Sequence, residues 1–294
     1  MRLRKTFAAT ALSLEFLRNI NMSKLYVVAT PIGNLSDISE RALNTLRSVD
    51  MIAAEDTRTT LKLLNHFQIK TPLTSYHKFN EQSKSNTLIE KMLSADWNVA
   101  IVSDCGTPCI SDPGYTFVAL AIENSIEVIS VPGPSAVIAA LAKSGFDLNE
   151  FSFYGFLDRN TKIQKEQLKH IKSCSKIAVL YESPNRISKL IQHIHELDAN
   201  CKLCVCRELT KLHETTYRGN PAEILAQFDM DINHMKGEYC IVAQWTVEDA
   251  NRSEQISLGI EAHAFQFLIQ GMEKDDIMTQ LIRQGFKRND IYKA

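Results

Sequence analysis

Short apolar runs alternate with amphipathic segments along the first half of the chain. Four of the apolar runs are almost continuous, which predicts strands buried on both faces of a parallel sheet; they cover residues 25–30, 50–55, 98–104 and 126–132. The amphipathic segments have apolar residues at helical spacing and cover residues 38–49, 57–67, 85–95 and 114–124. This alternation predicts an α/β domain with a parallel sheet over residues 23–135.

A second series of the same kind begins near Phe151. Its predicted strands cover residues 176–182, 202–208, 215–219 and 238–245, and its predicted helices cover residues 160–172, 185–197 and 221–228. The third of these strands alternates polar and apolar residues, which indicates a sheet that is not wholly parallel. We therefore predict a second α/β domain with a mixed sheet over residues 136–247.

Both ends of the chain are predicted to lie outside these two domains. Residues 1–22 have a basic start and a short apolar stretch that Glu15 interrupts, with no signal-peptide cleavage site, so we expect a non-core extension; an organelle-targeting peptide is the alternative. Residues 255–294 predict a small helical appendage with breaks at Gly271 and Gly285. A helix-turn-helix module that binds nucleic acid is the alternative for this segment.

Composition and charge exclude several function classes. The chain has 294 residues, with 33 Lys and Arg against 34 Asp and Glu, so no overall positive field attracts nucleic acid and any RNA contact must be local. None of the 11 glycines are spaced G-x-G, which excludes the dinucleotide-binding fingerprint, and the Walker phosphate loop is absent. No run of 18 apolar residues predicts a membrane span.

The cysteines indicate the compartment. Seven cysteines, an odd number in a long chain, are typical of reduced thiols and therefore of a cytoplasmic protein. Cys201, Cys204 and Cys206 cluster, but no second C-x-x-C or histidine pair completes a zinc site. We interpret them as structural residues of a strand and predict no metal.

Proline, glycine and hydroxyl residues gather in three loops that follow predicted strands, at residues 30–37, 103–114 and 131–136. In an open α/β sheet, ligands bind beyond the carboxyl ends of the strands, so we expect these loops to meet at one edge of the first sheet. Their backbone groups, hydroxyls and the carboxylates of Asp104 and Asp112 suit a zwitterionic ligand rather than a triphosphate. The alternative is that proline and glycine only form turns.

A series of motifs resembles a known family. The motifs are LYVVATPIGNLSDIS, IAAEDTRTT, SYHKFNE, VSDCGTPCISDPG, VPGPSA, GFL, YESPNR, RELTKLHET and KGEY, and they extend from Lys24 to Val242. In this order they are similar to those of the ribosomal small-subunit RNA methyltransferase I family, within the tetrapyrrole (corrin/porphyrin) methylase superfamily. The resemblance implies methyl transfer from S-adenosylmethionine to the ribose 2′-hydroxyl of a cytidine in the decoding region of 16S rRNA, within the 30S subunit. It also implies a homodimer of two-domain subunits with the donor in the cleft between domains.

The resemblance further implies which residues bind the methyl donor. In the first domain they are Pro31, Gly33, Asp104, Gly106, Thr107, Ser111, Asp112, Pro132, Gly133 and Ser135, and in the second they are Phe156, Glu182 and Gly237. Cys105 departs from the family pattern, which usually has a small residue such as alanine at this position. Its thiol would lie beside the donor.

Catalysis needs little beyond alignment, because the sulfonium methyl group is already activated. A base that accepts the hydroxyl proton, or a cation that stabilises the alkoxide, would add to the rate. We expect Arg58 and Lys211 to orient an RNA phosphate or the alkoxide, and Glu55 or His213 to accept the proton. The alternative for each is a solvated or ion-paired surface residue.

A basic segment follows the GFL motif. Residues 158–176 contain six basic residues against two acidic ones, a local charge of +4. We predict RNA contacts for Arg159, Lys162, Lys165 and Lys169, the alternative being a solvated helix face. Two rival functions stay open: a tetrapyrrole or diphthine-type methyltransferase of the same superfamily, and a non-catalytic RNA-binding factor in ribosome assembly.

Overall fold

The computed structural model describes residues 23–246, 260–269, 271–272, 274–283, 286 and 291. The chain divides into two compact units, Met1–Trp245 and Thr246–Ala294. The predicted extension at residues 1–22 lies outside the described residues. Among the described helices, none has the length and apolar character needed to cross a membrane.

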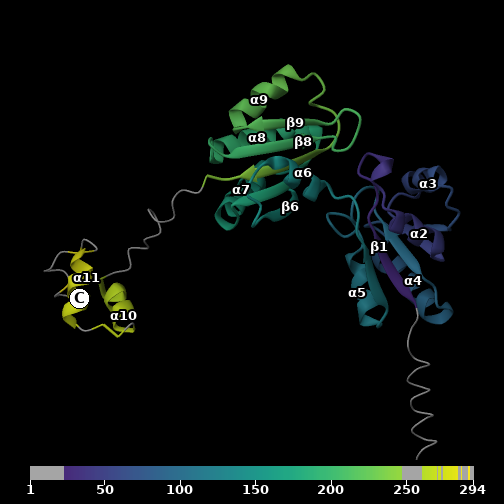
Figure 1. Cartoon of the computed structure of the whole chain (residues 1–294), viewed down its shortest axis with the longest axis horizontal. Coiled ribbons are helices and arrows are strands. Elements are labelled where there is room, and N and C mark those ends of the chain that lie inside the picture. Colours follow the sequence, from purple (N-terminus) through teal and green to yellow (C-terminus); the bar gives the residue numbers. More distant parts are fainter. Residues whose placement is uncertain are drawn as a thin grey trace, which may run out of the picture. The chain divides into compact units, whose positions relative to one another are not determined.

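The first sheet has five strands, all paired in parallel. The strands are β1 (Lys24–Val28), β2 (Met51–Ala54), β3 (Leu73–Ser75), β4 (Val99–Val102) and β5 (Glu127–Val131). They lie in the order β3-β2-β4-β1-β5. Figure 1 labels strand β1 of this sheet and the helices around it. Because β4 and β5 flank β1, the loops that follow these three strands leave the same edge of the sheet side by side.

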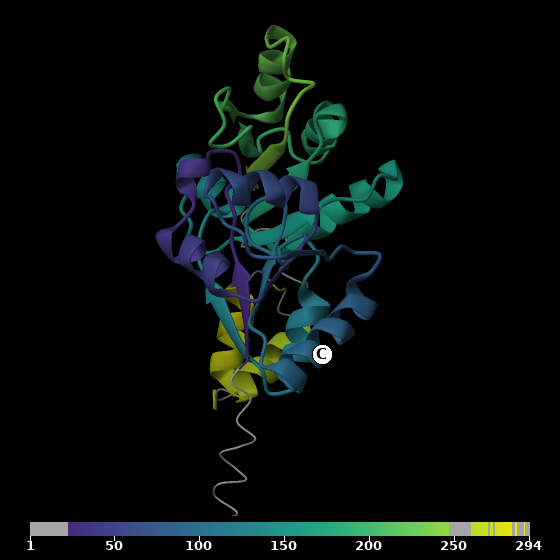
Figure 2. The same ribbon diagram turned by 90° about the vertical axis from the view of Figure 1, so that its right-hand side faces the viewer.

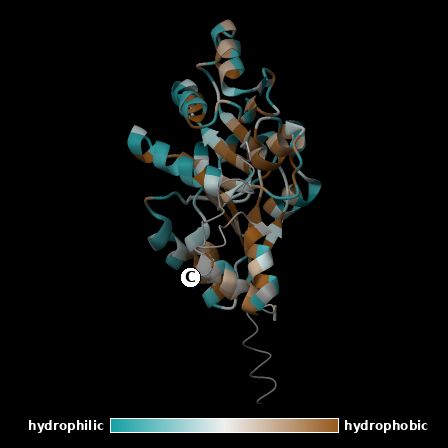
Figure 3. Ribbon diagram, turned by 90° about the vertical axis from the view of Figure 1, so that its left-hand side faces the viewer, coloured by the Kyte–Doolittle hydropathy of each residue, from teal (hydrophilic) through white to brown (hydrophobic). Residues whose placement is uncertain are grey.

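Helices cover both faces of this sheet, and Figure 2 shows blue helical ribbon beside the purple strand β1. One face packs against α2 (Glu40–Ser48) and α3 (Thr57–His66), and the other against α4 (Glu81–Ala95) and α5 (Tyr115–Glu123). Burial on both faces is the reason for the nearly continuous apolar runs, which appear as brown strands in Figure 3. Helix starts follow local capping: Ser39 accepts the Ala42 N–H at α2 and Asp56 accepts the Arg58 N–H at α3.

The second sheet is mixed. Its strands are β6 (Ser152–Phe156), β7 (Ile177–Glu182), β8 (Lys202–Arg207), β9 (Thr215–Gly219) and β10 (Tyr239–Gln244), in the order β6-β7-β10-β8-β9. Strands β6 and β7 are parallel, and the remaining pairs are antiparallel. The pairing of β6 with β7 shifts register before Gly155, which has a φ of +65° that favours glycine.

Alternating side chains of the second sheet enter two cores. Along β8, Leu203 and Val205 pack with α7 (Thr161–Cys174), α8 (Pro184–Leu197) and α9 (Pro221–Met230). Cys204 and Cys206 face the opposite way and pack with α6 (Ala136–Ser144). This placement agrees with a structural interpretation of these cysteines. Within the described residues, no three His, Cys, Asp or Glu side chains are placed to hold a metal ion.

The α/β fold class, with a parallel and a mixed sheet and small C-terminal helices, is confirmed. Helix α6 follows directly after VPGPS, where only a loop was expected, because Ser135 caps it and Gly145 ends it in the left-handed conformation. Strands β3 and β6 were also not predicted. In the C-terminal unit, Gly271 separates α10 (Ile260–Ile269) from α11 (Lys274–Arg283) as expected, whereas Gly285 lies outside the described residues. The domain boundaries at 135/136, 247 and 255 stay predictions.

Candidate functional site

The three strand-end loops of the first sheet are joined by hydrogen bonds. The Thr30 N–H donates to the Gly106 carbonyl at 2.8 Å, and the Gly106 N–H donates to the Thr30 carbonyl at 3.0 Å. The Thr107 hydroxyl donates to the Pro134 carbonyl at 3.4 Å. The loops after β1, β4 and β5 therefore meet at one edge of the sheet, as the topology argument predicted.

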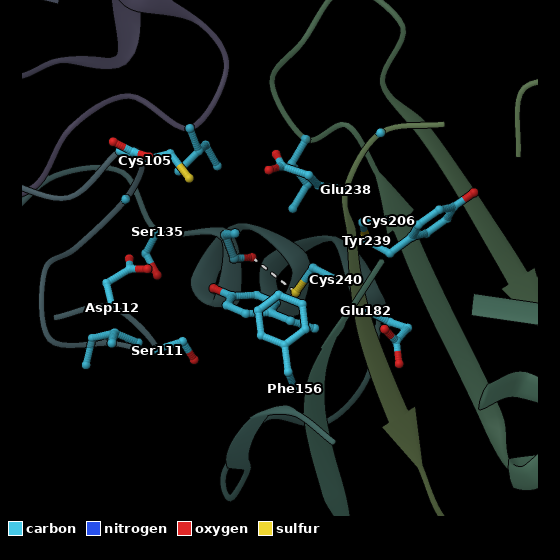
Figure 4. Close-up of a pocket in the computed structure, with 18 of the residues that line it drawn as sticks. Cys105, Ser111, Asp112, Ser135, Phe156, Glu182, Cys206, Glu238, Tyr239 and Cys240 are labelled. Atoms are coloured by element: carbon cyan, nitrogen blue, oxygen red, sulfur yellow. Dashed lines mark hydrogen bonds between the residues drawn. The ribbon is translucent and has the colours of Figure 1, made fainter. Parts of the chain in front are cut away.

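These loops and the second sheet enclose a cavity of about 410 Å³. In Figure 4, Ser111, Asp112 and Ser135 lie on one side of it, and Phe156, Tyr239 and Cys240 lie on the other. Most of the residues expected to bind a donor line this cavity: Asp104, Gly106, Thr107, Ser111, Asp112, Ser135, Phe156, Glu182 and Gly237. Pro31, Gly33, Pro132 and Gly133 are not among the lining residues.

Gly33 and Gly133 allow close packing beside the cavity instead. A Cβ atom at Gly33 would lie 2.8 Å from the Leu209 carbonyl oxygen, and one at Gly133 would lie 3.1 Å from the Cβ of Ala29. The neighbouring Asn34 N–H donates to the Thr210 hydroxyl at 3.1 Å. These glycines therefore let the loops approach one another, and a direct role in binding stays a prediction.

Three carboxylates gather at the cavity: Glu55 after β2, and Asp104 and Asp112 after β4. Burial raises the pKa of each of them. A neighbouring negative charge adds to each shift: that of Asp104 for Glu55, that of Asp56 for Asp104, and that of Glu55 for Asp112. The pKa of Asp112 rises to about 7, chiefly through burial and then through the charge of Glu55. Asp104 also accepts the Asp56 N–H at 3.0 Å, which joins the β2 and β4 loops. The group can therefore hold or accept a proton near neutral pH.

We expect Asp112→Asn to stabilise the protein at about pH 8 but not at about pH 4. Folding raises the pKa of Asp112, so the protonated carboxyl stabilises the folded state. This contribution is complete below the pKa of Asp112 in the unfolded chain and is lost as the pH rises through about 7. Because the side chain is partly solvent-exposed, the gain at about pH 8 is discounted to roughly 1–2 kcal/mol.

Thermal unfolding of the wild type and the variant at both pH values measures this effect. Asp229→Asn, at an exposed position of α9, is the control and should shift stability little at either pH. An equal change from Asp112→Asn at both pH values would show that ionisation is not the cause.

The four predicted catalytic residues separate into two pairs. Glu55 and Lys211 line the cavity, whereas Arg58 and His213 do not. The Lys211 ammonium lies 2.8 Å from Glu208 and 2.9 Å from Glu238, so its charge is balanced at the cavity wall.

Arg58 instead forms a surface ion pair. Its guanidinium contacts Asp56 through two nitrogens, at 2.7 and 3.0 Å, and this pair lowers the pKa of Asp56 to about 2. The Arg58 side chain is 88% exposed. His213 is exposed in the loop after β8. The geometry therefore favours Glu55 over His213 as the proton acceptor.

The second sheet supplies aromatic and fixed acidic groups. The Phe156 ring is exposed and lies 5.5 Å from the Tyr181 ring. Glu182 is buried, and its carboxylate accepts the Ser183 N–H at 2.7 Å and pairs with Arg186 at 2.8 Å. With these partners, the carboxylate of Glu182 orients the YESPNR segment at the cavity.

The predicted RNA-contacting residues of the basic segment lie away from the cavity wall. Arg159 precedes α7, and Lys162, Lys165 and Lys169 lie on it. Lys165 forms an ion pair with Glu196 at 2.6 Å, as expected for the solvated-face alternative. RNA binding by this segment stays a prediction.

The sequence argument missed further lining residues. Most of them belong to motifs already singled out, so a motif signal existed for them: Ile32, Ile110, Ala136, Tyr181, Ser183, Pro184, Leu209, Glu238 and Tyr239. Cys105, which was expected to lie beside the donor, also lines the cavity. Cys206 on β8 and Cys240 on β10 lie opposite each other in the sheet as free thiols, and both line the cavity. Only the packing of the second sheet reveals them, because their sequence context predicts buried strands.

Comparisons with known proteins agree with this architecture. The family model described as Tetrapyrrole (Corrin/Porphyrin) Methylases matches residues 24–225. A uroporphyrin-III C-methyl transferase from Thermus thermophilus, solved in complex with S-adenyl homocysteine, has a TM-score of 0.53 at 13% identity and covers 76% of this chain and 97% of that one. This likeness concerns the fold.

Two relatives are each named ribosomal RNA small subunit methyltransferase I. The relative from Halalkalibacterium halodurans is 38% identical over 271 residues, covering 91% of this chain and 93% of its own. The relative from Synechocystis is 42% identical over 275 residues, covering 92% and 97%. Such identity over nearly full length places the chain in this branch of the tetrapyrrole methylases. The chain belongs to the ribosomal RNA small subunit methyltransferase I family.

Proposed function

We propose that this protein transfers the methyl group of S-adenosylmethionine to the ribose 2′-hydroxyl of a cytidine in the decoding region of 16S rRNA. The proposed substrate is the 30S ribosomal subunit, and the proposed compartment is the cytoplasm. Family membership supports small-subunit rRNA as the substrate. The observation that carries the proposal is the cavity in which three strand-end loops bring backbone groups, hydroxyls and carboxylates together.

The cavity has the size and chemistry to bind S-adenosylmethionine, the methyl donor. Its volume of about 410 Å³ lies within the range of small-molecule sites. Phe156 offers an exposed aromatic face for the adenine, and the carboxylates of Asp104 and Asp112 suit a ligand with a ribose diol, an ammonium group and a sulfonium. The related fold solved with S-adenyl homocysteine, which is the donor after loss of its methyl group, supports the same cofactor.

The bound donor supplies an electrophilic methyl group. The residues of this chain align the acceptor hydroxyl with it and remove the hydroxyl proton. Glu55 is proposed as the acceptor, because it lines the cavity and its pKa is raised by burial and by Asp104. Lys211, also on the cavity wall, uses two of its three N–H donors on Glu208 and Glu238, and the third would donate to the developing alkoxide.

The proposed reaction is tested by mapping 2′-O-methylation of small-subunit rRNA. Cells that lack the protein should lose the modification at one cytidine of the decoding region, and a plasmid copy of the gene should restore it. Purified protein should restore it to 30S particles from those cells when S-adenosylmethionine is added. An unchanged methylation map in cells lacking the protein would refute the assignment.

The proposed homodimer is supported by the apolar outer surface of α5. Tyr115 and Ile122 on this helix are exposed, and Val118 and Leu120 are only partly buried. Exposed apolar residues grouped on one helix are typical of an interface. We propose that this surface of α5 forms the dimer contact.

We expect Ile122→Glu to convert the dimer into a monomer, because a charge would be buried in the contact. Analytical ultracentrifugation measures the change. Leu61→Glu, at an exposed position of α3, is the matched control and should leave the dimer intact. A dimer that persists in Ile122→Glu would exclude α5 as the contact.

A further inference from the structure

Phe79 and Leu212 are two large apolar side chains that the fold leaves almost fully exposed. Phe79 is 96% exposed and Leu212 is 93% exposed. Single exposed apolar residues are common on protein surfaces. These two differ because each stands in a hydrogen-bonded loop next to residues of the candidate cavity.

Two hydrogen bonds close the loop that carries Phe79. The His77 N–H donates to the Asn80 side-chain oxygen at 2.8 Å, and the Asn80 N–H donates back to the His77 carbonyl at 2.9 Å. One carboxylate oxygen of Glu81 accepts the Gly114 N–H at 2.9 Å. The SYHKFNE motif is thereby fixed to the end of the long loop that follows β4.

This loop lies beside the candidate cavity. The Tyr76 N–H donates to the Ala54 carbonyl at 2.7 Å, which places the segment after β3 beside Glu55, a lining residue. The His77 and Phe79 rings are 6.1 Å apart. Because β3 and β2 are neighbours in the sheet, the loops that follow them leave the same edge. Phe79 is therefore presented to solvent near Glu55.

The Leu212 loop is fixed in a similar way on the second sheet. Leu212 directly follows Lys211, which lines the cavity. The Glu214 N–H donates to the Lys211 carbonyl at 3.1 Å, and the Thr210 N–H donates to the Glu214 carboxylate at 2.7 Å. Glu214 also pairs with Lys143 of α6. Each sheet thus presents one rigid apolar tip beside the cavity.

The surroundings of Phe79 favour an anionic ligand with flat apolar surfaces. Lys78 is exposed and Lys84 partly exposed, and neither has an ion-pair partner among the described residues. The Nδ1 atom of His77 is buried, and no described residue forms a hydrogen bond with it. Free ammonium groups suit phosphates, and an exposed aromatic ring suits an unstacked base. An RNA strand provides both.

We propose that Phe79 stacks on an unpaired base of the RNA substrate next to the target nucleotide, and that Leu212 packs against the same displaced segment from the second sheet. This inference rests on the proposed function. Proteins that bind folded RNA recognise unstacked bases through aromatic side chains. When an enzyme extracts a nucleotide from its stack, the neighbouring bases lose a stacking contact that a protein side chain can replace. Tips that hydrogen bonds already hold in place supply those contacts at a reduced ordering cost.

The experiment measures binding of 30S particles from cells lacking the protein, and methylation of the same particles. Phe79→Ala is expected to weaken particle binding by roughly 10-fold or more, the effect of losing one stacked base. Calorimetric affinity for S-adenosylmethionine should stay at the wild-type value. Phe79→Trp should retain particle binding, and Leu212→Ala should weaken it.

Salt dependence separates stacking from charge. Phe79→Ala should lower the affinity for 30S particles without changing the slope of log affinity against log salt concentration. Lys78→Ala should make that slope shallower by the amount expected for the loss of about one phosphate contact. Ile232→Ala is the matched control, because Ile232 is 91% exposed and does not line the cavity. It should behave as wild type in both assays.

The outcomes distinguish this inference from the proposed function. Wild-type protein that fails to methylate the particles would count against the proposed function itself. An active wild type with equally active, equally tight-binding Phe79→Ala would overturn the stacking role alone. A change in sedimentation of Phe79→Ala would also overturn it, because Phe79 would then be a contact between protein copies.

Discussion

Replacing Gly106 by valine is expected to abolish binding of S-adenosylmethionine. Gly106 has a φ of +78°, a region that a β-branched residue such as valine rarely adopts. Its main-chain groups form both hydrogen bonds to Thr30, and a Cβ atom would lie 3.5 Å from the Ile32 side chain. Valine would therefore separate the loops that line the cavity. We expect calorimetry to show affinity lowered by roughly 100-fold or more, since several hydrogen bonds of about 1 kcal/mol each are lost or misplaced.

Gly145→Val is the matched control for this experiment. Gly145 has a similar φ of +75° at the end of α6, and nothing lies within 4 Å of the position of its Cβ. Both variants carry the backbone penalty, so both should lower the melting temperature, but only Gly106→Val should lose the donor. Equal loss of binding in the two variants would trace the effect to general destabilisation, and undiminished affinity in Gly106→Val would remove the donor from this cavity.

Replacing Glu55 by glutamine is expected to lower kcat by roughly 100-fold or more while leaving donor affinity nearly unchanged. The amide keeps the shape of the side chain but cannot accept the hydroxyl proton, and general-base catalysis contributes about 10²–10⁴-fold. Single-turnover methylation of 30S particles measures the chemical step. Glu90→Gln, at an exposed position of α4, is the control and should keep the wild-type rate.

The pH dependence of the same reaction provides a second test. Burial raises the pKa of Glu55, and the charge of Asp104 adds to this shift. A base acts in its ionised form, so the wild-type rate should rise as the pH increases through the raised pKa of Glu55 and then level off. Glu55→Gln should lose most of this rise. A wild-type rate that falls over the same range, or a fully active Glu55→Gln, would exclude the carboxylate as proton acceptor.

The strands and helices that sequence reasoning located best are those with two buried faces or a strong amphipathic stripe. Strand β4 is buried at all four positions, and its apolar run was unmistakable. Strand β3 has only three residues, none of them fully buried, so its pattern carries little signal. Helix α6 was missed because VPGPSA reads as a loop until Ser135 is seen to cap the helix that follows.

The loops of the first sheet and most of the expected binding residues could be predicted from the sequence, whereas the choice among the catalytic candidates and part of the second sheet's lining could not. Proline and glycine at the strand ends indicated at which edge of the first sheet the loops meet, and the structure confirms that the loops meet there. From the sequence, Glu55 and His213 were equally good candidates for the proton acceptor. Of these two, only Glu55 lines the cavity. Cys206 and Cys240 line it from the middle of the second sheet, where hydropathy predicts nothing but burial.

By itself, the sequence determined the alternation of strands and helices, the loops at the strand ends and the family resemblance, because each depends on residues close together in the chain. The tertiary structure alone decided that the loops after β1 and β4 are hydrogen-bonded to each other and that Lys211 is held between Glu208 and Glu238. It also decided that burial, and then the charge of Glu55, raise the pKa of Asp112 to about 7. These properties depend on distances and burial between segments far apart in the chain, and local pattern carries no information about either.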